Sequence, residues 1–592
     1  MTRKSLKFIS TFLSICLAQA IAGSPKIARD LGDLQPGTKV DVIIQFVNPG
    51  SDAGAPGMGG VKKEELPLIG AALYTMPVNA LDALAKNPNV RYVSPDRPVF
   101  RTLDYSAEAS GASIARTYGW DGKGIGVAII DSGIGTSFDL LVPGTQTSRV
   151  VYSATFTTKG TADEFGHGTH VAGIVAGNGA ASSPLFASRT FRGIAPAANL
   201  INLRVLDKNG AGTDSAVIKA IDAAIKLKKT HNIRVINLSL GRQVMESYVN
   251  DPLCLAAEKA WKAGIVVVVA AGNEGRNNSV GNDGYATIAS PANDPYVITV
   301  GAMKTVSTAS RGDDLIASYS SKGPTAIDHI AKPDLVAPGN RTISLANLTG
   351  LLYSSYPGNL VPYTDYLKTS YTAYSRSYYK LSGTSMATPV VSGAVALLLQ
   401  KQPSLTPDQV KARLMKTATK TFPSYSVATD PVTGQSYRSQ YDIFTVGAGY
   451  VDVWAALNNA DPTSGNALSP KAQFETSTQG VSLLCDSGAV WGTGAVWGTG
   501  AVWGTCATGA VWGTGAVWGT QVLVAGTGAV WGTGAVWGTQ TASGFGAVWG
   551  TGAVWGTQTS TDSAKVNYTS SMVSLTGIGT PGAISVAIYG EN

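Results

Sequence analysis

The sequence is poor in charge, in histidine and in cysteine. Only 14% of its 592 residues are Asp, Glu, Lys or Arg, and it has four histidines and four cysteines. The formal net charge is +7, but Arg3, Lys4 and Lys7 carry three of these charges, and segment 23–105 has nine basic and nine acidic residues. The small remainder forms no basic cluster interleaved with aromatics, which argues against nucleic acid as a partner. No cysteine spacing is typical of a zinc site.

The sequence also lacks an apolar run as long as the ~20 residues that a membrane-spanning helix needs. The run at 8–22, FISTFLSICLAQAIA, follows a positive start and ends in Ala20-Ile21-Ala22, a small-x-small pattern typical of signal cleavage. A membrane anchor is the alternative, but the run is too short for it. We therefore predict a signal peptide over 1–22 and a secreted, extracellular protein, either free or associated with the cell surface.

Segment 110–460 alternates apolar strands with helical patterns. Apolar runs predict strands at 124–131, 200–206, 234–240, 265–273 and 296–302, and their composition is typical of strands buried on both faces. Between them, segment 213–229 places its isoleucines and valine on one helical face. Alternation of this kind predicts an α/β fold with a mostly parallel sheet and helices on both faces.

Two flanking regions follow other patterns. Segment 24–105 is expected to be a small α+β unit, with strands at 41–47, 71–76 and 90–95 and a helix at 78–87. Segment 345–380 is rich in tyrosine and has no clear period, so we expect a long surface loop there.

Segment 488–557 has no Asp, Glu, Lys or Arg and holds nine of the twelve tryptophans in nine copies of GAVWGT. Two glycines in six residues disfavour a helix, and an even period would keep the tryptophans of an unbroken run on one face of a strand. Three interpretations remain: a flexible low-complexity tail, a small β-structure packed on itself, or an aromatic face that binds polysaccharide, cell envelope or insoluble protein.

The cysteines divide into three groups. Cys16 leaves with the predicted signal peptide. Cys254 lies in the apolar helix pattern DPLCLAAEKAWKAG and is expected to be a buried free thiol. Cys485 and Cys506 bracket three repeats, and we predict a disulfide between them in an oxidising compartment.

Four polar residues lie where a predicted strand ends or a helix begins, which is where sites form in open α/β sheets. Asp131 ends the strand GVAIID, and His167 opens the helical pattern HGTHVAGIVAG. Ser385 precedes a long apolar helix in GTSMATPVVSG, and Asn273 follows the strand VVVVAA. Taken singly, each has an ordinary structural interpretation: a turn or cap residue for Asp131, Ser385 and Asn273, and a satisfied structural residue for His167.

Together these residues fit acyl transfer, which needs a nucleophile, a base, a group that orients the base, and donors for an oxyanion. A helix N-terminus at Ser385 would favour developing negative charge. A metal pair of His167 and His170 is the alternative, but no carboxylate or further histidine at helical spacing supports it.

The segments IIDSGI, GHGTHVAG, AAGNEG and GTSMATP, in this order, resemble the four signatures of the subtilisin family of serine peptidases. The resemblance covers about 118–460. It implies a serine endopeptidase with Asp131, His167 and Ser385 as its triad and with Asn273 and the Ser385 amide in the oxyanion hole. His170 is then a structural residue.

The resemblance extends to the substrate. It implies that two backbone segments wall the primary pocket, formed by Ser239, Leu240 and Gly241 and by Ala270, Ala271 and Gly272. Small residues there imply a roomy, apolar pocket, and the polypeptide substrate would add an extended strand to these edges. Segment 40–105 resembles the family's inhibitory propeptide, an intramolecular partner whose end would pass through the active site near Tyr105.

Some features depart from the family. Segment 177–193, GNGAASSPLFASRTFRG, does not match its best-known calcium loop, so we expect no cofactor, with a structural calcium ion as the alternative. The other hypotheses are a sedolisin-type acid peptidase, which uses Glu as base and Asp at the oxyanion, and an adhesion protein in which the peptidase unit only supports the repeats. Because a neutral imidazole is the base here and its reference pKa is about 6.5, we expect activity at neutral to alkaline pH.

The predicted organisation is a signal peptide (1–22), an inhibitory propeptide (23–105), a catalytic domain (106–460), a linker (461–487), a repeat region (488–557) and a tail (558–592).

Overall fold

The structure is a computed structural model. It describes residues 24–28, 31, 38–96, 98–101, 109–183, 187–279, 281–306, 308, 310–460, 465–475 and 480–484, with short stretches at 495–496, 502–503, 510–512, 516–518, 587–588 and 590–591. The predicted signal peptide, the expected junction at Tyr105, and Cys485 and Cys506 lie outside the described residues.

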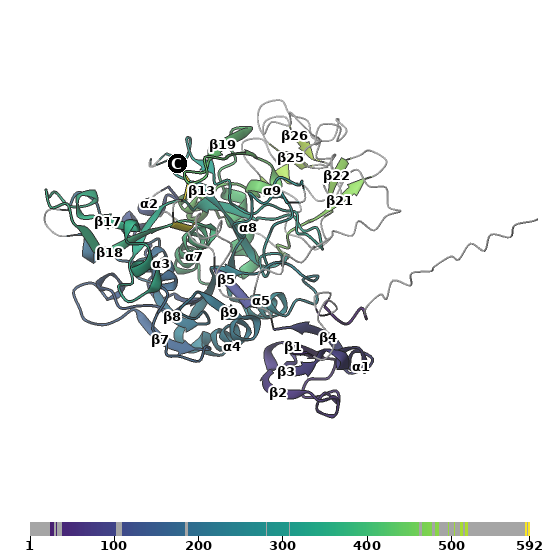
Figure 1. The fold of residues 1–592 in the computed structure, drawn as a ribbon. Helices are drawn as coiled ribbons and strands as arrows, with labels where there is room; N and C mark the ends of the chain where they lie inside the picture. Colours follow the sequence, from purple (N-terminus) through teal and green to yellow (C-terminus); the bar gives the residue numbers. More distant parts are fainter. Residues whose placement is uncertain are drawn as a thin grey trace, which may run out of the picture.

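The N-terminal unit is a four-stranded antiparallel sheet with one short helix (Figure 1). Its strands run in the order β2-β3-β1-β4. Their bounds, with those of helix α1, are β1 Lys39–Phe46, β2 Val61–Leu66, β3 Ala71–Pro77, α1 Leu81–Ala85 and β4 Val90–Pro95. The α+β prediction is confirmed here except for β2, whose sequence VKKEEL is too charged for the apolar pattern of a strand. This edge strand is largely exposed, so charge is tolerated on it.

The larger unit is built on an eight-stranded sheet in the order β14-β13-β12-β10-β6-β8-β7, with β15 also paired to β13. All pairings are parallel except that of β14 with β13. The strands are β6 Gly126–Asp131, β7 Val150–Thr155, β8 Asn199–Arg204, β10 Ile233–Leu238, β12 Val266–Ala270, β13 Ile298–Lys304, β14 Leu315–Ile316 and β15 Leu335–Pro338. Five of them fall on the apolar runs expected to be strands, and the predicted fold class is confirmed.

Helices cover both faces of this sheet (Figure 1). One pair is α3 His167–Ala176 with α7 Thr384–Lys401, and the other is α4 Asp214–His231 with α5 Pro252–Lys262. Helix α7 is buried along nearly its whole length, which explains its apolar sequence on every side. Thr213 caps α4 and Asp251 caps α5 through their side chains. Within the described residues, no helix is long and apolar enough to cross a membrane.

Cys254 lies in α5 and is a buried free thiol, as expected. Its Sγ donates a hydrogen bond to Oδ1 of Asn293 at 3.3 Å. Burial raises the pKa of this thiol well above its ordinary value, so it stays protonated and unreactive in the folded protein.

The expectation of a surface loop over 345–380 is wrong. The segment forms a three-stranded antiparallel sheet in the order β16-β18-β17, with strands β16 Thr342–Leu345, β17 Leu360–Pro362 and β18 Tyr374–Leu381, and a short helix α6 Leu351–Ser355. Tyr366 and Tyr378 are buried and pack edge-to-face at 5.4 Å, with Phe191 beside both. The buried tyrosines therefore join the main hydrophobic core, and aromatic packing of this kind leaves no helical or alternating period in the sequence.

The region after the large unit contains more structure than the predicted linker over 461–487 allowed. Strands β21 Lys471–Glu475 and β22 Gly480–Leu484 pair antiparallel, and a bridge joins Lys471 to Ile330. In the repeats, the strands β23 Ala495–Val496, β24 Val502–Trp503, β25 Ala510–Trp512 and β26 Ala516–Trp518 lie in four successive copies and pair in sequence order.

Candidate active site

Asp131 is the last residue of β6 and is completely buried. Its Oδ1 accepts a hydrogen bond from the Ser132 amide at 2.7 Å and lies 2.7 Å from Nδ1 of His167. The chain then turns at Gly133, whose φ is +115° and where a Cβ would lie 2.9 Å from the backbone of Asp163. Only glycine fits this turn, so the GVAIIDSG sequence fixes where the carboxylate leaves the sheet.

His167 is the first residue of α3, and the loop before it is held by Asp163, a residue that the sequence analysis did not single out. Asp163 Oδ1 accepts from the amides of Phe165 at 3.1 Å and Gly166 at 2.7 Å, and its Oδ2 accepts from the Thr169 amide at 2.9 Å. A carboxylate that caps the first turn of α3 in this way fixes the position of the imidazole. The sequence feature that could have identified Asp163 is its position, as an acidic residue four positions before the start of α3.

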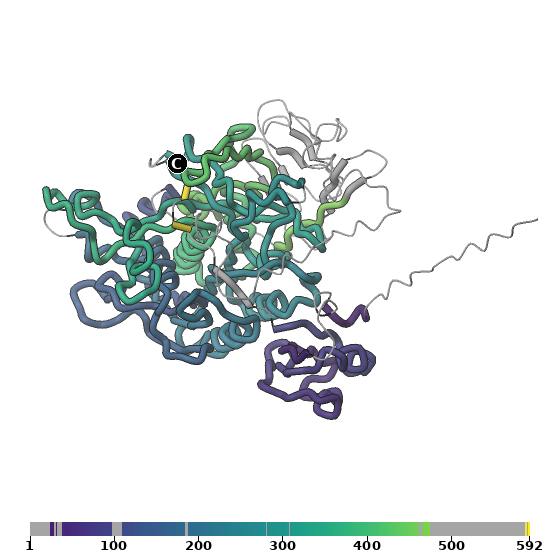
Figure 2. Tube along the Cα trace, in the orientation of Figure 1, coloured from purple at the N-terminus to yellow at the C-terminus, as the bar shows by residue number. Residues whose placement is uncertain are grey.

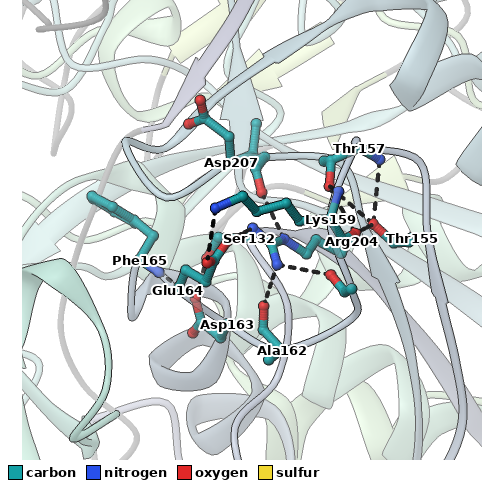
Figure 3. A network of polar contacts seen from close by, with 12 residues as sticks. Ser132, Thr155, Thr157, Lys159, Ala162, Asp163, Glu164, Phe165, Arg204 and Asp207 are labelled. Carbon is teal, nitrogen blue, oxygen red and sulfur yellow. Dashed lines mark hydrogen bonds and ion pairs between the residues drawn. The ribbon is translucent and has the colours of Figure 1, made fainter.

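Ser132 and Arg204 extend this network (Figure 3). Ser132 Oγ donates to Asp163 Oδ1 at 2.9 Å and accepts from the Gly168 amide at 2.9 Å, so it ties the Asp131 turn to α3. Arg204, at the end of β8 and 1% exposed, donates to the carbonyls of Gly160 and Ala162 and to Glu164 Oε2 at 2.6 Å. These residues position the loop rather than the reacting atoms. The sequence feature that could have identified Arg204 is an arginine inside the apolar run LINLRVL, because a charge in such a run is expected to be buried and paired.

Ser385 is the second residue of α7, after Gly383 with φ +138°. Its Oγ donates to the carbonyl oxygen of Ser239 at 2.9 Å, and Ser239 Oγ donates to the carbonyl of Ser385 at 2.6 Å. Asn237, in β10, donates to Ser239 Oγ at 2.9 Å. These hydrogen bonds join the first turn of α7 to the residue that follows β10 and fix the position of Ser385. An anion is favoured at a helix N-terminus of this kind.

Asn273 comes three residues after the end of β12 and is 8% exposed. Its Oδ1 accepts from the Thr384 amide at 2.8 Å and from Thr384 Oγ1 at 3.1 Å. The two N–H donors of Nδ2 are the remaining hydrogen-bonding groups of this side chain. The side chain is thus anchored at its oxygen next to the first turn of α7, and its Nδ2 is the group that could act as an oxyanion donor.

The two predicted wall segments follow neighbouring strands. Leu238 of β10 lies opposite Val269 of β12, so Ser239, Leu240 and Gly241 leave the sheet beside Ala270, Ala271 and Gly272. Gly272 has φ +109°, and its amide donates to Thr384 Oγ1 at 3.1 Å, which links this wall to the start of α7. The structure therefore brings Asp131 to His167, and it brings Ser239, Asn273 and Gly272 to the first turn of α7, which carries Ser385.

A strand that follows the N-terminal unit lies along the first of these walls, Leu240–Gly241. Strand β5, Pro98–Arg101, pairs antiparallel on one side with β11, Leu240–Gly241, and on the other with β9, Ala211–Thr213 (Figure 1). Phe100 is opposite Gly241 and Arg101 is opposite Leu240. A polypeptide can thus bind here as the middle strand of a three-stranded sheet.

His170, three residues after His167, is buried and serves the fold. Its Nε2 lies 3.1 Å from the carbonyl oxygen of Tyr379 in β18. Burial, helped by the nearby His167, lowers the pKa of His170 to about 3, so the ring is neutral. Across the residues that the structure covers, no group of three or more His, Cys, Asp or Glu is arranged to hold a metal ion.

Comparisons with known proteins agree with this geometry. A family model described as the subtilase family matches residues 122–473, more than half of the chain. Serine protease AprX of Bacillus subtilis is 38% identical over 404 residues, which cover 65% of this chain and 84% of that protein. Subtilisin E of Bacillus subtilis is 34% identical over 368 residues, which cover 61% and 78%.

Among solved structures, fervidolysin from Fervidobacterium pennivorans, described as a keratinolytic enzyme related to subtilisin, aligns with a TM-score of 0.53 at 21% identity, covering 78% of this chain and 68% of that one. At that identity the likeness concerns the fold alone. The match to more than half of the chain and the identity to AprX establish more: this protein belongs to the subtilase family and is a serine-type endopeptidase.

Proposed function

We propose that this endopeptidase is made as a secreted zymogen, processes itself, and hydrolyses polypeptides through an acyl-enzyme on Ser385. The observation that carries the proposal is the contact of Asp131 Oδ1 with His167 Nδ1 at 2.7 Å, with both side chains fully buried. A carboxylate at this nitrogen holds the imidazole with Nδ1 protonated, so Nε2 is the basic nitrogen.

In the proposed reaction, Ser385 Oγ attacks the carbonyl carbon of the scissile bond while His167 Nε2 takes its proton. The Ser385 amide and Asn273 Nδ2 donate hydrogen bonds to the oxyanion of the tetrahedral intermediate. The C–N bond then breaks, and His167 gives its proton to the leaving amine. Water, activated by the same imidazole, attacks the ester, and the acid product and the Ser385 hydroxyl are released.

The position of β5 supports an intramolecular propeptide. Arg101 is opposite Leu240, the residue after Ser239, whose carbonyl accepts the Ser385 hydroxyl, so β5 pairs with the segment that leads from Ser239. We therefore propose self-cleavage near Tyr105, beyond the end of β5. The N-terminal unit would stay docked after cleavage, because Asp96 accepts from the Ser215 amide at 2.8 Å and from Ser215 Oγ at 2.7 Å at the start of α4.

Ser385→Ala tests the catalytic assignment. The variant should be inactive and should accumulate as an uncut precursor, detected by intact mass and N-terminal sequencing. Loss of the triad serine lowers kcat by about six orders of magnitude in subtilisin, which sets the scale here. Ser404→Ala, which alters an exposed serine beyond α7, is the matched control and should process normally. Normal turnover by Ser385→Ala would refute the proposal.

The proposed mechanism also separates this protein from a sedolisin-type acid peptidase. That hypothesis requires a glutamate base and an optimum near pH 4, whereas the residue bonded to Asp131 is His167. A pH–activity profile that rises toward neutral and alkaline pH supports the histidine mechanism, and an optimum near pH 4 contradicts it.

We propose further that no calcium ion is needed at segment 177–193. The acidic group beside this segment is Asp139, and protein donors already bind it: the Ala181 amide at 2.7 Å from Oδ1 and the Tyr378 hydroxyl at 2.8 Å from Oδ2. These contacts do not fit a cation at that carboxylate. Chelation with EDTA should leave the unfolding temperature unchanged, and a clear drop in that temperature would show a calcium site.

For the repeats we propose a role in retention on a surface or in attack on insoluble substrate, with polysaccharide, cell envelope or insoluble protein as partners. Deletion of 488–557 should leave hydrolysis of a short soluble peptide unchanged and lower stability, surface retention or attack on insoluble protein. The adhesion hypothesis predicts instead that Ser385→Ala retains the protein's whole biological effect. A loss of peptide hydrolysis in the folded deletion variant would make the repeats part of the catalytic unit.

A further inference from the structure

Residues 587–588 and 590–591, at the end of the predicted tail, lie against the catalytic unit (Figure 2). Ala587 and Ile588 are 5% and 7% exposed, and Glu591 is 1% exposed. The segment lies more than a hundred residues beyond the end of the family match at 473. Burial of a glutamate so far from the main unit in sequence requires a site built to receive it.

The first half of the segment contacts the chain that leads into Ser385. The Ser382 amide donates to the Ala587 carbonyl at 2.9 Å, and Ser382 directly precedes Gly383, the cap of α7. Asn359 Nδ2 donates to the carbonyls of Ile588 and of Lys380, both at 2.8 Å, which ties the segment to β18. The segment is thus attached to both the strand and the turn that deliver the serine.

Its second half contacts the chain that follows Asn273. Glu591 Oε1 accepts from Arg276 Nη2 at 2.7 Å and from the Ser318 amide at 2.8 Å, and Lys304 Nζ lies 3.7 Å from Oε2. Arg276 is three residues after Asn273. The side chain of Glu591 is fully buried. A buried charge needs compensation, which this guanidinium and the hydrogen bonds around it provide.

Two further features define the fit. Asn340 brackets Glu591, because its Nδ2 donates to the Glu591 carbonyl at 2.8 Å and its Oδ1 accepts from the Glu591 amide at 2.9 Å. Gly590 has φ +63°, and a Cβ at that position would lie 2.4 Å from Ser382 Oγ. The site therefore selects a glutamate that is directly preceded by glycine.

We propose that residues 587–588 and 590–591 form a peptide ligand of the catalytic unit, which we call the clasp, and that the clasp holds the Ser385 turn and the Asn273 loop in their relative position. Its site consists of Arg276, Ser318, Asn340, Asn359 and Ser382. The clasp residues are positioning residues, since none of them touches the reacting atoms. The expected effect of the clasp on turnover depends on the proposed function, that is, on the roles proposed for Ser385 and Asn273. Binding of the peptide itself is independent of those roles.

The binding test uses the inactive Ser385→Ala chain ended after residue 586 and a fluorescent peptide SVAIYGEN, the sequence of 585–592. Saturable binding is expected, and the same peptide with the Glu591→Gln change should bind at least ~10-fold more weakly because it loses the charge opposite Arg276. Absence of binding by a folded truncated chain overturns the clasp whatever the catalytic mechanism is.

The functional test uses the active chain. Truncation after 586, or Glu591→Gln in the full chain, should lower kcat by roughly 10- to 100-fold with KM changed less than about twofold, as misplacement of catalytic groups does. Peptide SVAIYGEN added to the truncated enzyme should restore kcat. The matched control is Glu258→Gln, an acidic residue of α5 that pairs with the exposed Lys262, and it should keep full kcat.

Each alternative outcome is distinct. If kcat and unfolding temperature are unchanged in both variants, the segment has no positioning role. If truncation raises activity and the peptide inhibits, the segment blocks the enzyme and the clasp is wrong. Should the truncated chain fail to fold, Glu591→Gln in the full chain still decides, through its kcat and KM. Deletion of 488–557 retains 587–591 and, if the clasp holds, should leave kcat on a short peptide unchanged.

Discussion

Ser385 and Ser239 hold each other through reciprocal hydrogen bonds: the hydroxyl of each donates to the carbonyl oxygen of the other, at 2.9 Å and 2.6 Å. Ser239 thus has two functions. Its backbone begins the wall along which β5 lies, and its side chain anchors the first turn of α7. The residue was identified from the resemblance only as part of the wall.

Removal of this anchor should lower turnover. Ser239→Ala keeps the carbonyl that receives the Ser385 hydroxyl but loses the hydroxyl that binds the Ser385 carbonyl and accepts from Asn237. A hydrogen bond of this kind contributes about 0.5–1.5 kcal/mol, so we expect kcat to fall about 3- to 10-fold. Steady-state kinetics on a short peptide measure the effect, with Ser404→Ala as control. Unchanged kcat would show that the backbone alone positions Ser385.

Asn273→Leu should lower kcat with little change in KM, because the side chain acts on the oxyanion and not on the bound substrate. The corresponding loss in subtilisin, roughly 100- to 1000-fold in kcat, sets the scale. Ser404→Ala, which alters an exposed serine beyond α7, is the control and should keep full kcat. A change confined to KM would assign Asn273 to substrate binding.

Acid should destabilise the protein partly through His170. Its pKa in the folded state is about 3, below the ordinary 6.5, so the unfolded chain binds a proton that the folded protein does not as pH falls through 6.5. Stability present above pH 6.5 is therefore lost toward pH 3, by about 3 kcal/mol between pH 6.5 and 4. Urea unfolding of Ser385→Ala with and without His170→Gln, at pH 7 and pH 4, measures this difference.

The His170→Gln background should lose less free energy of unfolding on acidification than its parent. Because both proteins contain the same other titratable groups, the difference between them isolates the contribution of His170 to the pH dependence of stability. His329, whose pKa burial lowers to about 4, contributes in the same direction, and Asp294, whose pKa burial raises to about 8, contributes in the opposite one. An equal acid loss in both proteins would contradict a buried neutral ring at this position.

The docked N-terminal unit should loosen when Asp96 is replaced. Asp96→Ala removes two hydrogen bonds to Ser215, and bonds to a charged acceptor contribute about 1.5–3 kcal/mol each. In the Ser385→Ala precursor, hydrogen exchange at segment 98–101 and at the start of α4 should accelerate. Asp82→Ala, on the exposed side of α1, should not change it. Equal exchange in both variants would mean that Asp96 is not needed for docking and that β5 pairing, with contacts such as Gln45 Nε2 to the Asn250 carbonyl at 2.7 Å, holds the unit.

The sequence predicted the central sheet well. Strands such as β6 and β12 are buried on both faces, so their sequences are short continuous apolar runs, which are typical of such strands. The four residues proposed as catalytic could be located for a related reason: each ends or follows a strand or opens a helix, and glycines such as Gly133 and Gly383 fix those turns. Register and order of the strands were not available, because they depend on contacts between distant segments.

Three features had no usable local pattern. Strand β2 is charged because it lies at an edge, and the tyrosines of 345–380 pack on Phe191, which is far away in sequence. Asp163 and Ser132 are ordinary turn residues until the fold brings α3 beside the end of β6. The docking of Glu591 was equally hidden, since its partners Arg276 and Asn340 come from separate loops and share no spacing with it.

The pairing of β5 between β9 and β11 has a consequence for substrate choice. A chain segment can occupy this position only as a single extended strand with both of its backbone edges unoccupied, since β9 and β11 take one edge each. Helices and paired strands in a folded substrate have those edges already engaged. The enzyme should therefore cut native proteins at loops and at segments that open transiently, and the rate of such cuts should follow the local opening equilibrium of the target more closely than its amino-acid sequence.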